Sequence, residues 1–202
     1  QNAVWYESCA RLTNYFPGSE PATRLRVLEL GCGPGVTAIE IKKQRGEALV
    51  IGLDLAPRML HEAQKYIQRA HLDSSQIPLV LADAGALPFA DGSLDVVTGH
   101  SFLYLVSNRE LVLSEAERVL RVGGIYVSME PQAGEKPAGV YRRMWRNIRY
   151  AISIIPWRFY SGAHGQLSDS RFRKLFEAAG LEPRGSEAVL EGLGIIGWAE
   201  KI

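Results

Sequence analysis

Three glycines at alternating positions, Gly31, Gly33 and Gly35, directly follow an apolar run that ends on Leu30. Glycine lacks a side chain, so a segment of this composition can turn sharply and let a ligand approach the backbone closely. Loops of this kind, between a strand and a helix, receive nucleotides. A tight turn without a ligand is the alternative interpretation, and the glycines alone do not decide between the two.

Carboxylates stand at three nearby positions where they could bind a nucleotide. Glu29 precedes the first glycine, Asp54 ends the next apolar run and Asp83 ends the third. In doubly wound nucleotide-binding domains, an acid at the end of the second strand accepts hydrogen bonds from the ribose hydroxyls. Asp54 could instead cap the helix that follows it, but its position just downstream of the glycine loop favours the ribose.

The elements that must position these residues alternate between apolar strands and amphipathic helices, which predicts a parallel sheet with helices on both faces. Pro57 suits the first turn of its helix, Asn108 can cap the next one, and Gly123 and Gly124 are expected to close it. The expected strands are residues 24–30, 48–54, 77–83, 93–100 and 125–130, and the expected helices are 36–43, 57–70 and 109–121.

The alternation stops after the fifth strand and resumes near residue 168. Ser168 can cap a helix that runs through Ala179, and Gly180 ends it. Residues 187–193 and 193–202 are extended runs that predict a closing hairpin around Gly192, on one edge of the sheet. We therefore expect residues 1–202 to form a single domain, with residues 131–167 as an inserted cap segment.

The composition is that of a compact globular domain, since 47% of the 202 residues are hydrophobic and 22% are charged. No apolar run approaches the roughly 20 residues that a helix needs to span a bilayer. Cys9 and Cys32 are far apart in the sequence, which argues against a disulfide framework and favours a cytoplasmic setting. The chain begins with Gln1 rather than methionine, which suggests a trimmed N-terminus and leaves a removed targeting segment open.

Charge is unevenly distributed, although the net charge is only +1. No carboxylate lies between Glu135 and Asp169, and the same stretch contains six basic residues: Lys136, Arg142, Arg143, Arg146, Arg149 and Arg158. Helical spacing from residue 141 to 155 places an apolar stripe beside this arginine flank, which predicts an amphipathic helix. The stripe consists of Tyr141, Trp145, Ile148 and Ile152.

Packing against the core is the default interpretation of that stripe. An anionic membrane surface, contacted through residues 141–160, is the main alternative, and it would suit a lipophilic ligand. An anionic soluble ligand or RNA would also explain the arginines, but the small net charge makes RNA the least favoured. We therefore expect no nucleic-acid partner, and the oligomeric state stays open.

The run Glu29-Leu30-Gly31-Cys32-Gly33-Pro34-Gly35 resembles the acidic-x-Gly-x-Gly-x-Gly signature of class I S-adenosylmethionine-dependent methyltransferases. Dinucleotide folds prefer Gly-x-Gly-x-x-Gly, so the spacing disfavours a nicotinamide-dependent oxidoreductase, which remains the second hypothesis. A non-catalytic S-adenosylmethionine-binding domain is the third. The resemblance extends to the small-molecule branch of the family, similar to the ubiquinone and menaquinone biosynthesis enzymes, through Asp83-Ala84, Leu87-Pro88-Phe89, Asp95-Val96-Val97 and residues 120–124.

With the strand pattern, the resemblance predicts an α/β fold: a Rossmann-like, doubly wound, mostly parallel seven-stranded sheet with a C-terminal antiparallel hairpin. It implies that S-adenosylmethionine binds with its methionine part on the backbone of the glycine loop and near Glu29 and His100. Asp54 would bind the ribose and Asp83 the adenine amine. The implied cofactor-binding residues are Glu29, Gly31, Gly33, Gly35, Asp54, Leu55, Met59, Asp83, Ala84 and His100; Leu55 and Met59 could equally be core residues.

Methyl transfer is an in-line displacement, so the protein mainly aligns the acceptor with the methyl group and excludes water. His100 is the candidate general base for a hydroxyl or carbon-acid acceptor, although it could simply shape the pocket. The methyl acceptor is expected to be a small molecule, with a lipophilic one as an option, under the cap segment. Candidate acceptor-pocket residues are Tyr6, Tyr15, Tyr104, Trp145 and His164, each of which could instead be a packing residue. We expect no metal site.

Overall fold

The computed structural model of the chain describes residues 3–18, 24–134, 145 and 148–202. The strands are β1 (Arg26–Leu30), β2 (Leu49–Asp54), β3 (Leu79–Leu81), β4 (Leu94–His100), β5 (Leu120–Pro131), β6 (Leu181–Val189) and β7 (Gly194–Lys201). The α-helices are α1 (Ala3–Leu12), α2 (Val36–Gln44), α3 (Pro57–Arg69), α4 (Arg109–Val119), α6 (Ile148–His164) and α7 (Asp169–Ala178). Short 3-10 helices cover Thr13–Tyr15, Leu103–Leu105 and Leu190–Gly192.

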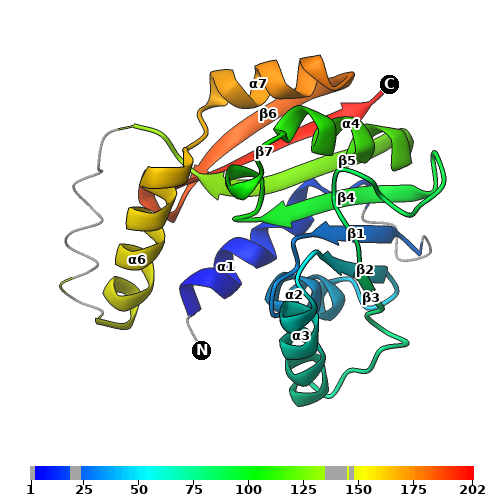
Figure 1. The fold of residues 1–202 in the computed structure, drawn as a ribbon, viewed down its shortest axis with the longest axis horizontal. Helices are drawn as coiled ribbons and strands as arrows, with labels where there is room; N and C mark the ends of the chain where they lie inside the picture. The colour runs from blue at the N-terminus through cyan, green and yellow to red at the C-terminus, as the bar shows by residue number, and fades with distance from the viewer. Residues whose placement is uncertain (1–2, 19–23, 135–144, 146–147) are drawn as a thin grey trace.

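The strands form one sheet in the order β3-β2-β1-β4-β5-β7-β6 (Figure 1). All pairings from β3 to β5 are parallel, whereas β7 runs antiparallel to both β5 and β6. The predicted seven-stranded, doubly wound sheet with a closing antiparallel hairpin on one edge is therefore confirmed. β1 and β4 lie in the middle and are buried along almost their whole length, as continuous apolar strands covered on both faces must be.

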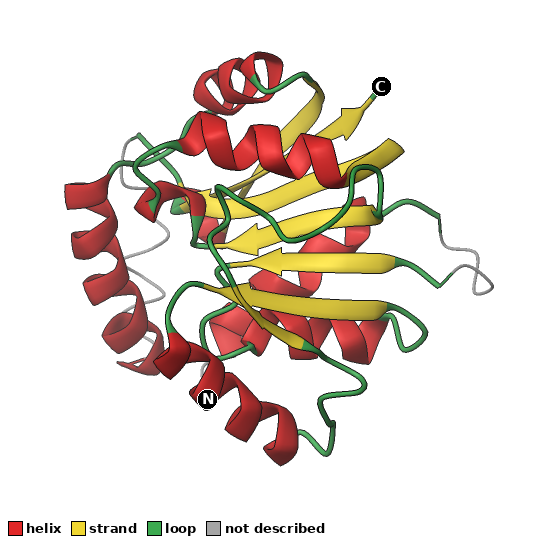
Figure 2. Ribbon diagram, turned by 45° about the vertical axis from the view of Figure 1, so that its right-hand side comes forward, coloured by secondary structure: helices red, strands yellow, loops and turns green. Residues whose placement is uncertain are grey.

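Helices cover the sheet on both sides (Figure 2). On one face α4 and α7 pack through Leu113 and Phe176 against the side chains of Leu28 and Tyr126. On the other face α1, α2 and α3 pack against a second set of sheet residues that includes Val27 and Val127. Helix α1 was not among the elements expected from the sequence.

The end of α4 corrects one expectation. Gly123 and Gly124 were expected to close this helix, but α4 ends at Val119, and β5 has already begun at Leu120, which pairs with Leu94 of β4. The glycines lie inside the strand, where Gly123 has a φ of +73° and a Cβ at Gly124 would lie 2.8 Å from the carbonyl oxygen of Arg121. They permit a bend within the strand rather than a helix end.

The two predicted helix caps are present. The Asn108 side chain accepts a hydrogen bond from the backbone N–H of Leu111, and the Ser168 hydroxyl accepts one from that of Arg171. Gly180, with a φ of +80°, follows α7 and leads into β6, which begins at Leu181 and is longer than expected. The caps at Asn108 and Ser168 therefore determine where α4 and α7 begin.

The segment between β5 and α7 is closed at its base. Gln132 pairs with Leu167 in a parallel bridge, and the Leu167 N–H donates to the Pro131 carbonyl at 2.8 Å. Within the segment, α6 lies beside the edge where β1 and β4 end (Figures 1 and 2). Tyr141, Arg142, Arg143 and Arg146 of the predicted amphipathic helix lie outside the described residues, and α6 itself extends past residue 155 to His164.

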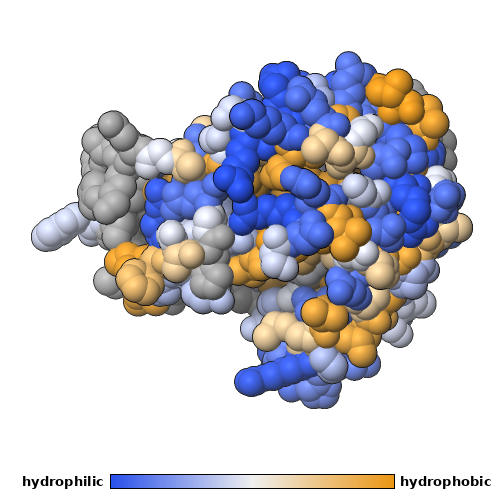
Figure 3. All heavy atoms as spheres, turned by 45° about the horizontal axis from the view of Figure 1, so that its top comes forward, coloured by the Kyte–Doolittle hydropathy of each residue, from blue (hydrophilic) through white to orange (hydrophobic). Residues whose placement is uncertain are grey.

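The predicted core packing of the aromatic and aliphatic stripe is wrong for the members whose side chains are described. Trp145 is 92% exposed and Ile152 is 65% exposed. Ile152, Ile155, Phe159 and Tyr160 form one exposed stripe on α6, while Ile154 and Ser161 are buried on the opposite side. Hydrophobic residues also gather at the left of Figure 3, where α6 lies in Figure 1. No helix in the described part of the chain is long and apolar enough to cross a membrane.

Candidate functional site

The glycine loop joins β1 to α2 at the carboxyl edge of the sheet. Gly31, Gly33 and Gly35 have φ values of +59°, +50° and +78°, a region that residues with a side chain rarely adopt. A Cβ at Gly35 would lie 3.2 Å from the Cβ of Ala63, so this glycine also lets the loop approach α3 closely. The glycine pattern is therefore required by the backbone itself.

The loop is fastened to the end of β2. The Cys32 N–H donates to the Leu53 carbonyl at 2.9 Å, and the Gly33 N–H donates to Oδ2 of Asp54 at 2.8 Å. Oδ1 of Asp54 accepts from the N–H of Ala56, directly before α3, at 2.9 Å. Asp54 thus joins the glycine loop to the start of α3. Its contact with Ala56 agrees with the interpretation of Asp54 as an acid at the start of a helix, and its contact with Gly33 places it beside the loop that would bind a ligand.

Glu29 is a buried carboxyl under the loop, only 2% exposed. Burial raises its pKa to about 8, and the nearby charge of Asp54 adds to the shift, while hydrogen bonds from the Thr37 hydroxyl and the Ala38 N–H oppose it. Its Oε2 atom is buried and has no hydrogen-bond partner among the described residues. A buried carboxyl oxygen without a partner is costly, so this atom marks a place where a polar group of a ligand can pair with Glu29.

A cavity of about 780 Å³ opens around these groups. Its lining brings together every predicted cofactor-binding residue except Gly35, namely Glu29, Gly31, Gly33, Asp54, Leu55, Met59, Asp83, Ala84 and His100. Gly35 instead begins α2. Leu55 and Met59 are exposed, so they are not core residues. Among the described lining residues three are carboxylates and none is Lys or Arg, which favours a cationic ligand over an anionic one.

The two cysteines both line this cavity, and neither forms a disulfide, as the sequence predicted. Cys9, on α1, and Cys32 are both free, buried and part of the lining. The Sγ atom of Cys9 lies 3.3 Å from the hydroxyl of Thr37. Burial raises the pKa of both thiols, so they stay protonated and unreactive at neutral pH.

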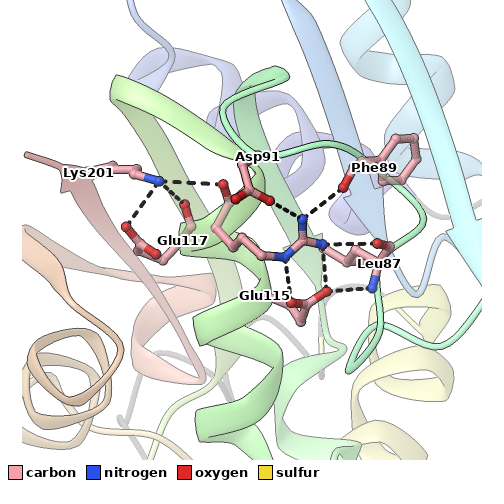
Figure 4. A network of polar contacts seen from close by, with 7 residues as sticks. Leu87, Phe89, Asp91, Glu115, Glu117 and Lys201 are labelled. Atoms are coloured by element: carbon pink, nitrogen blue, oxygen red, sulfur yellow. Dashed lines mark hydrogen bonds and ion pairs between the residues drawn. The ribbon is translucent and has the colours of Figure 1, made fainter.

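Asp83 and Ala84 begin a loop that is held firmly to α4. Asp83 itself is exposed, and its Oδ1 accepts from the Gly85 N–H at 2.8 Å. Further along, Arg118 donates to the carbonyls of Leu87 and Phe89 and pairs with Glu115 and Asp91, as Figure 4 shows. This network fixes the loop that carries Asp83 to the rim of the cavity.

His100, the last residue of β4, is half-buried in the cavity wall. Its Nε2 lies 2.8 Å from the hydroxyl of Ser8 on α1. Burial lowers the pKa of the imidazole to about 4, while a hydrogen bond to its own backbone works in the opposite direction. The ring is therefore neutral at physiological pH.

The structure does not bring the predicted acceptor-pocket tyrosines to the described lining. Tyr6 borders a separate hollow of about 150 Å³ with Tyr66. Tyr15 donates to Glu187 and its ring centroid lies 4.3 Å from that of Trp198, and Tyr104 is buried at 5% exposure. None of the three tyrosines is among the described residues that line the 780 Å³ cavity.

The remaining two candidates lie on the cap segment. Trp145 is exposed and does not line the cavity, and of His164 only the backbone, at the end of α6, is described. The aromatic residue that α6 contributes to the cavity is Trp157, whose Nε1–H donates to the Ser101 hydroxyl at 3.2 Å. Trp157 was not predicted from the sequence, because the predicted apolar stripe, with Trp145 and Ile152, lies on the exposed side of the helix.

Two further residues were missed. Phe102 lines the cavity beside the glycine loop, and Glu130, at the end of β5, holds the turn that carries Phe102. Glu130 had a usable signal, because it is an acid at the carboxyl end of an apolar strand, as Asp54 and Asp83 are. Phe102 had none, since one aromatic residue in a loop is not distinguishable from a core residue by its spacing.

Comparison with known families gives the site its class. A family model described as a methyltransferase domain matches residues 28–128, half of the chain, and these residues include the glycine loop, Asp54 and Asp83. The chain belongs to the methyltransferase domain family. This membership confirms the predicted resemblance to methyltransferases, and it argues against the nicotinamide-dependent alternative.

Two relatives show the range of this family. A demethylmenaquinone methyltransferase of Thermus thermophilus is 37% identical over 72% of this chain and 65% of its own length. A 27-O-demethylrifamycin SV methyltransferase of Amycolatopsis mediterranei is 27% identical over 94% of this chain and 66% of its own length. This methyltransferase therefore spans just under two thirds of the length of each relative.

One solved structure shows the shared fold. The geranyl diphosphate C-methyltransferase of Streptomyces coelicolor, in complex with Mg2+, geranyl diphosphate and S-adenosyl-L-homocysteine, superposes with a TM-score of 0.71. The likeness covers 97% of this chain and 77% of the other at 14% sequence identity, so it concerns the fold alone.

Proposed function

We propose that this methyltransferase binds S-adenosylmethionine in the 780 Å³ cavity and transfers its methyl group to a small-molecule acceptor. The observation that carries the proposal is the buried Oε2 of Glu29, which has no partner among the described residues and lies at a cavity whose described lining holds carboxylates but no Lys or Arg. S-adenosylmethionine offers an ammonium and a sulfonium, which suit such a lining. A dinucleotide would instead bring an anionic pyrophosphate.

The lining residues divide into roles along the cavity. Glu29 would accept from the ammonium while the backbone of Gly31 to Gly35 follows the methionine part, and Asp54 would accept from the ribose hydroxyls. Asp83 would accept from the adenine amine, with Ala84 beside it. Leu55 and Met59, which are exposed at 68% and 38%, supply apolar surface for the adenine ring. His100 closes the methionine end.

The chemistry asks little of the protein beyond alignment. S-adenosylmethionine, when bound, supplies a methyl group on a good leaving group, and the chain's residues orient it and exclude water. We propose His100 as the residue that faces the acceptor. Its neutral imidazole can accept a proton, but with a pKa of about 4 it is a weak base, so this role requires an acceptor with an acidic proton.

Ligand-dependent thermal stability tests the cofactor. S-adenosylmethionine and its demethylated product should raise the melting temperature, because a ligand that binds only the folded state stabilises it by mass action, and NAD should not. Asp54→Ala should weaken S-adenosylmethionine binding by about 1 to 3 kcal/mol, the cost of losing hydrogen bonds to a charged group. An unchanged affinity by calorimetry would remove the ribose assignment.

His100→Gln tests the acceptor side. Loss of turnover with cofactor affinity retained would support proton transfer by His100. Full turnover would limit His100 to shaping the cavity wall. Ser8→Ala is the matched variant, since it removes the hydroxyl 2.8 Å from Nε2 and leaves the imidazole in place.

We also propose that residues 131–167 form the cap over the acceptor site and touch an anionic membrane surface through residues 141–160. Trp157 supports the first part, because it joins α6 to the cavity wall at Ser101. The exposed stripe of α6, in a stretch with six basic residues and no carboxylate, supports the second. A lipophilic acceptor would then enter from the bilayer.

Vesicle co-sedimentation tests the membrane contact. The protein should bind vesicles that contain anionic phosphatidylserine and not neutral phosphatidylcholine vesicles. Ile155→Ser with Phe159→Ser should reduce this binding, whereas Val122→Ser, which changes a residue 69% exposed on β5, should not. Equal binding by all three proteins, or none to either vesicle, would contradict the membrane contact and leave the methyltransferase assignment intact.

A further inference from the structure

The turn after β4 has an unfavourable backbone that something must hold in place. Ser101 has a φ of +55°, in the left-handed region that residues other than glycine rarely adopt. Its N–H donates to the Met129 carbonyl at 2.7 Å. A 3-10 helix, Leu103–Leu105, follows directly and carries the chain along the cavity rim.

Glu130 holds this turn from the sheet side. Its Oε1 accepts from the N–H of Leu103 at 2.9 Å and of Phe102 at 3.4 Å, and its Oε2 accepts from the N–H of Tyr104 at 3.2 Å. The side chain is fully buried, at 0% exposure. Three consecutive backbone donors therefore meet a single carboxylate.

Arg109 holds the same turn from the other side. Its Nε donates to the carbonyl of Leu103 at 3.0 Å and its Nη2 to that of Tyr104 at 3.0 Å. The charge of Arg109 also lowers the pKa of Glu130, against the burial that raises it to about 7. Glu130 thus holds the backbone N–H groups of the turn, and Arg109 holds two of its carbonyl groups.

The turn presents Phe102 to the glycine loop. A Cβ at Gly31 would lie 2.2 Å from Cδ2 of the Phe102 ring, so the ring rests directly on the backbone of Gly31. Phe102 also lines the cavity, whereas Glu130 is not among the residues described as lining it. The contacts of Glu130 with the cavity wall are those that it makes with the turn.

We infer that Glu130 is a positioning residue that sets cofactor affinity by holding the Phe102 ring against the glycine loop. The inference rests on the proposed S-adenosylmethionine site. Gln at position 130 offers one acceptor oxygen where the carboxylate offers two, so the turn loses part of its hold. The ring then no longer has one fixed position on Gly31.

A double-mutant cycle tests this inference, because residues that act through one another show non-additive effects. By calorimetry, Glu130→Gln and Phe102→Ala should each weaken S-adenosylmethionine binding about tenfold, the size of one lost or misplaced interaction. The double variant should bind no more weakly than Phe102→Ala alone. A merely structural role for Glu130 would instead give additive losses.

Asp95→Asn is the matched control. Asp95 is also buried, accepts from a backbone N–H, that of Arg26, and pairs with two arginines, but it lies at the opposite end of the sheet, at the start of β4. It should lower the melting temperature and leave the affinity unchanged. Should Glu130→Gln not fold, Arg109→Lys in the same cycle releases the turn from the other side and should show the same non-additivity with Phe102→Ala.

The outcomes separate the inference from the proposed function. Wild-type protein that does not bind S-adenosylmethionine would contradict the proposed function itself. Wild-type binding together with unchanged affinity in Glu130→Gln, or with a Glu130→Gln effect that persists in full without the Phe102 ring, would overturn only the role of Glu130.

Discussion

Two buried glutamates, Glu29 and Glu130, lie near the carboxyl ends of β1 and β5, on either side of β4, and differ in how many hydrogen bonds their oxygens accept. Glu29 of β1 shares its face with Val27, toward α1 and α2, and one of its oxygens has no partner among the described residues. Glu130 of β5 shares its face with Tyr126, toward α4 and α7, and its two oxygens accept from three backbone N–H groups. Burial raises the pKa of both, to about 8 and about 7.

This difference in hydrogen bonding separates a carboxyl that can bind a ligand from one that holds the protein backbone in position. A buried carboxylate whose two oxygens both accept from backbone N–H groups of one turn stabilises the chain around it. A buried carboxylate with an unused oxygen at a cavity costs free energy until a donor arrives, so its cost is recovered only when a ligand binds. This contrast supports the two proposals, that Glu29 binds the cofactor and that Glu130 supports the cofactor site.

The largest expected effect is on cofactor affinity. Glu29→Gln should weaken S-adenosylmethionine binding by about 10- to 100-fold, because a charged hydrogen bond contributes about 1.5 to 3 kcal/mol. Glu130→Gln should weaken binding less, by about tenfold, because Glu130 acts through the turn that carries Phe102. Calorimetry on both variants measures the ratio, and a Glu130 effect larger than the Glu29 effect would reverse the two roles.

A pH dependence of binding should follow from the same contrast. With a pKa of about 8, Glu29 is mostly protonated in the free protein at neutral pH, and it must lose its proton to accept from an ammonium. Affinity should therefore rise as pH increases from 6 to 8, with protons released on binding. Calorimetry in two buffers of different ionisation enthalpy measures the release.

The variants Glu29→Gln and Glu130→Gln show which carboxyl causes the pH dependence of S-adenosylmethionine affinity. Glu29→Gln should bind with a flat pH profile over the same range, whereas Glu130→Gln should keep the rise. Proton release that persists in Glu29→Gln would assign the titration to another group and break the comparison.

Much of this site could be predicted from the sequence because its parts are local. Gly31, Gly33 and Gly35 need positive φ values, and Asp54 follows an apolar strand, so each leaves a pattern within a few residues. The sheet followed for the same reason, since strand and helix periodicities are local. The end of α4 was wrong because Leu120 joins a strand through its pairing with Leu94, a contact between distant parts of the chain.

The residues that α6 and the turn after β4 contribute to the cavity were not predicted, because their positions depend on tertiary contacts. Trp157 reaches the cavity because α6 turns the face with Ile154 inward, and the sequence contains apolar residues on both faces of that helix. Tyr15 packs on Trp198, far along the chain, which no spacing indicates. Phe102 depends on Glu130 across the sheet. Residues whose role comes from tertiary contacts leave no local pattern to find.

The smallest expected effect is on stability without ligand. A carboxyl whose pKa is raised on folding contributes stability that is fully present below its unfolded pKa of about 4.5 and is lost as pH rises through its folded pKa. For Glu130 that loss ends near pH 7, and for Glu29 it continues to about pH 8. The free protein should therefore lose stability between pH 5 and 8.

The losses of the two carboxyls begin at the same pH and end at different ones. Relative to wild type, both glutamine variants should gain in melting temperature from about pH 5, because the unfolded wild type ionises there while the buried carboxyls stay protonated. The relative gain of Glu130→Gln should stop near pH 7, whereas that of Glu29→Gln should continue to about pH 8. Thermal melts at pH 5, 7 and 8 measure both. If the melting temperatures of the two variants change in parallel at all three pH values, the two carboxyls titrate alike. The unused oxygen of Glu29 then does not distinguish a binding group from a positioning one.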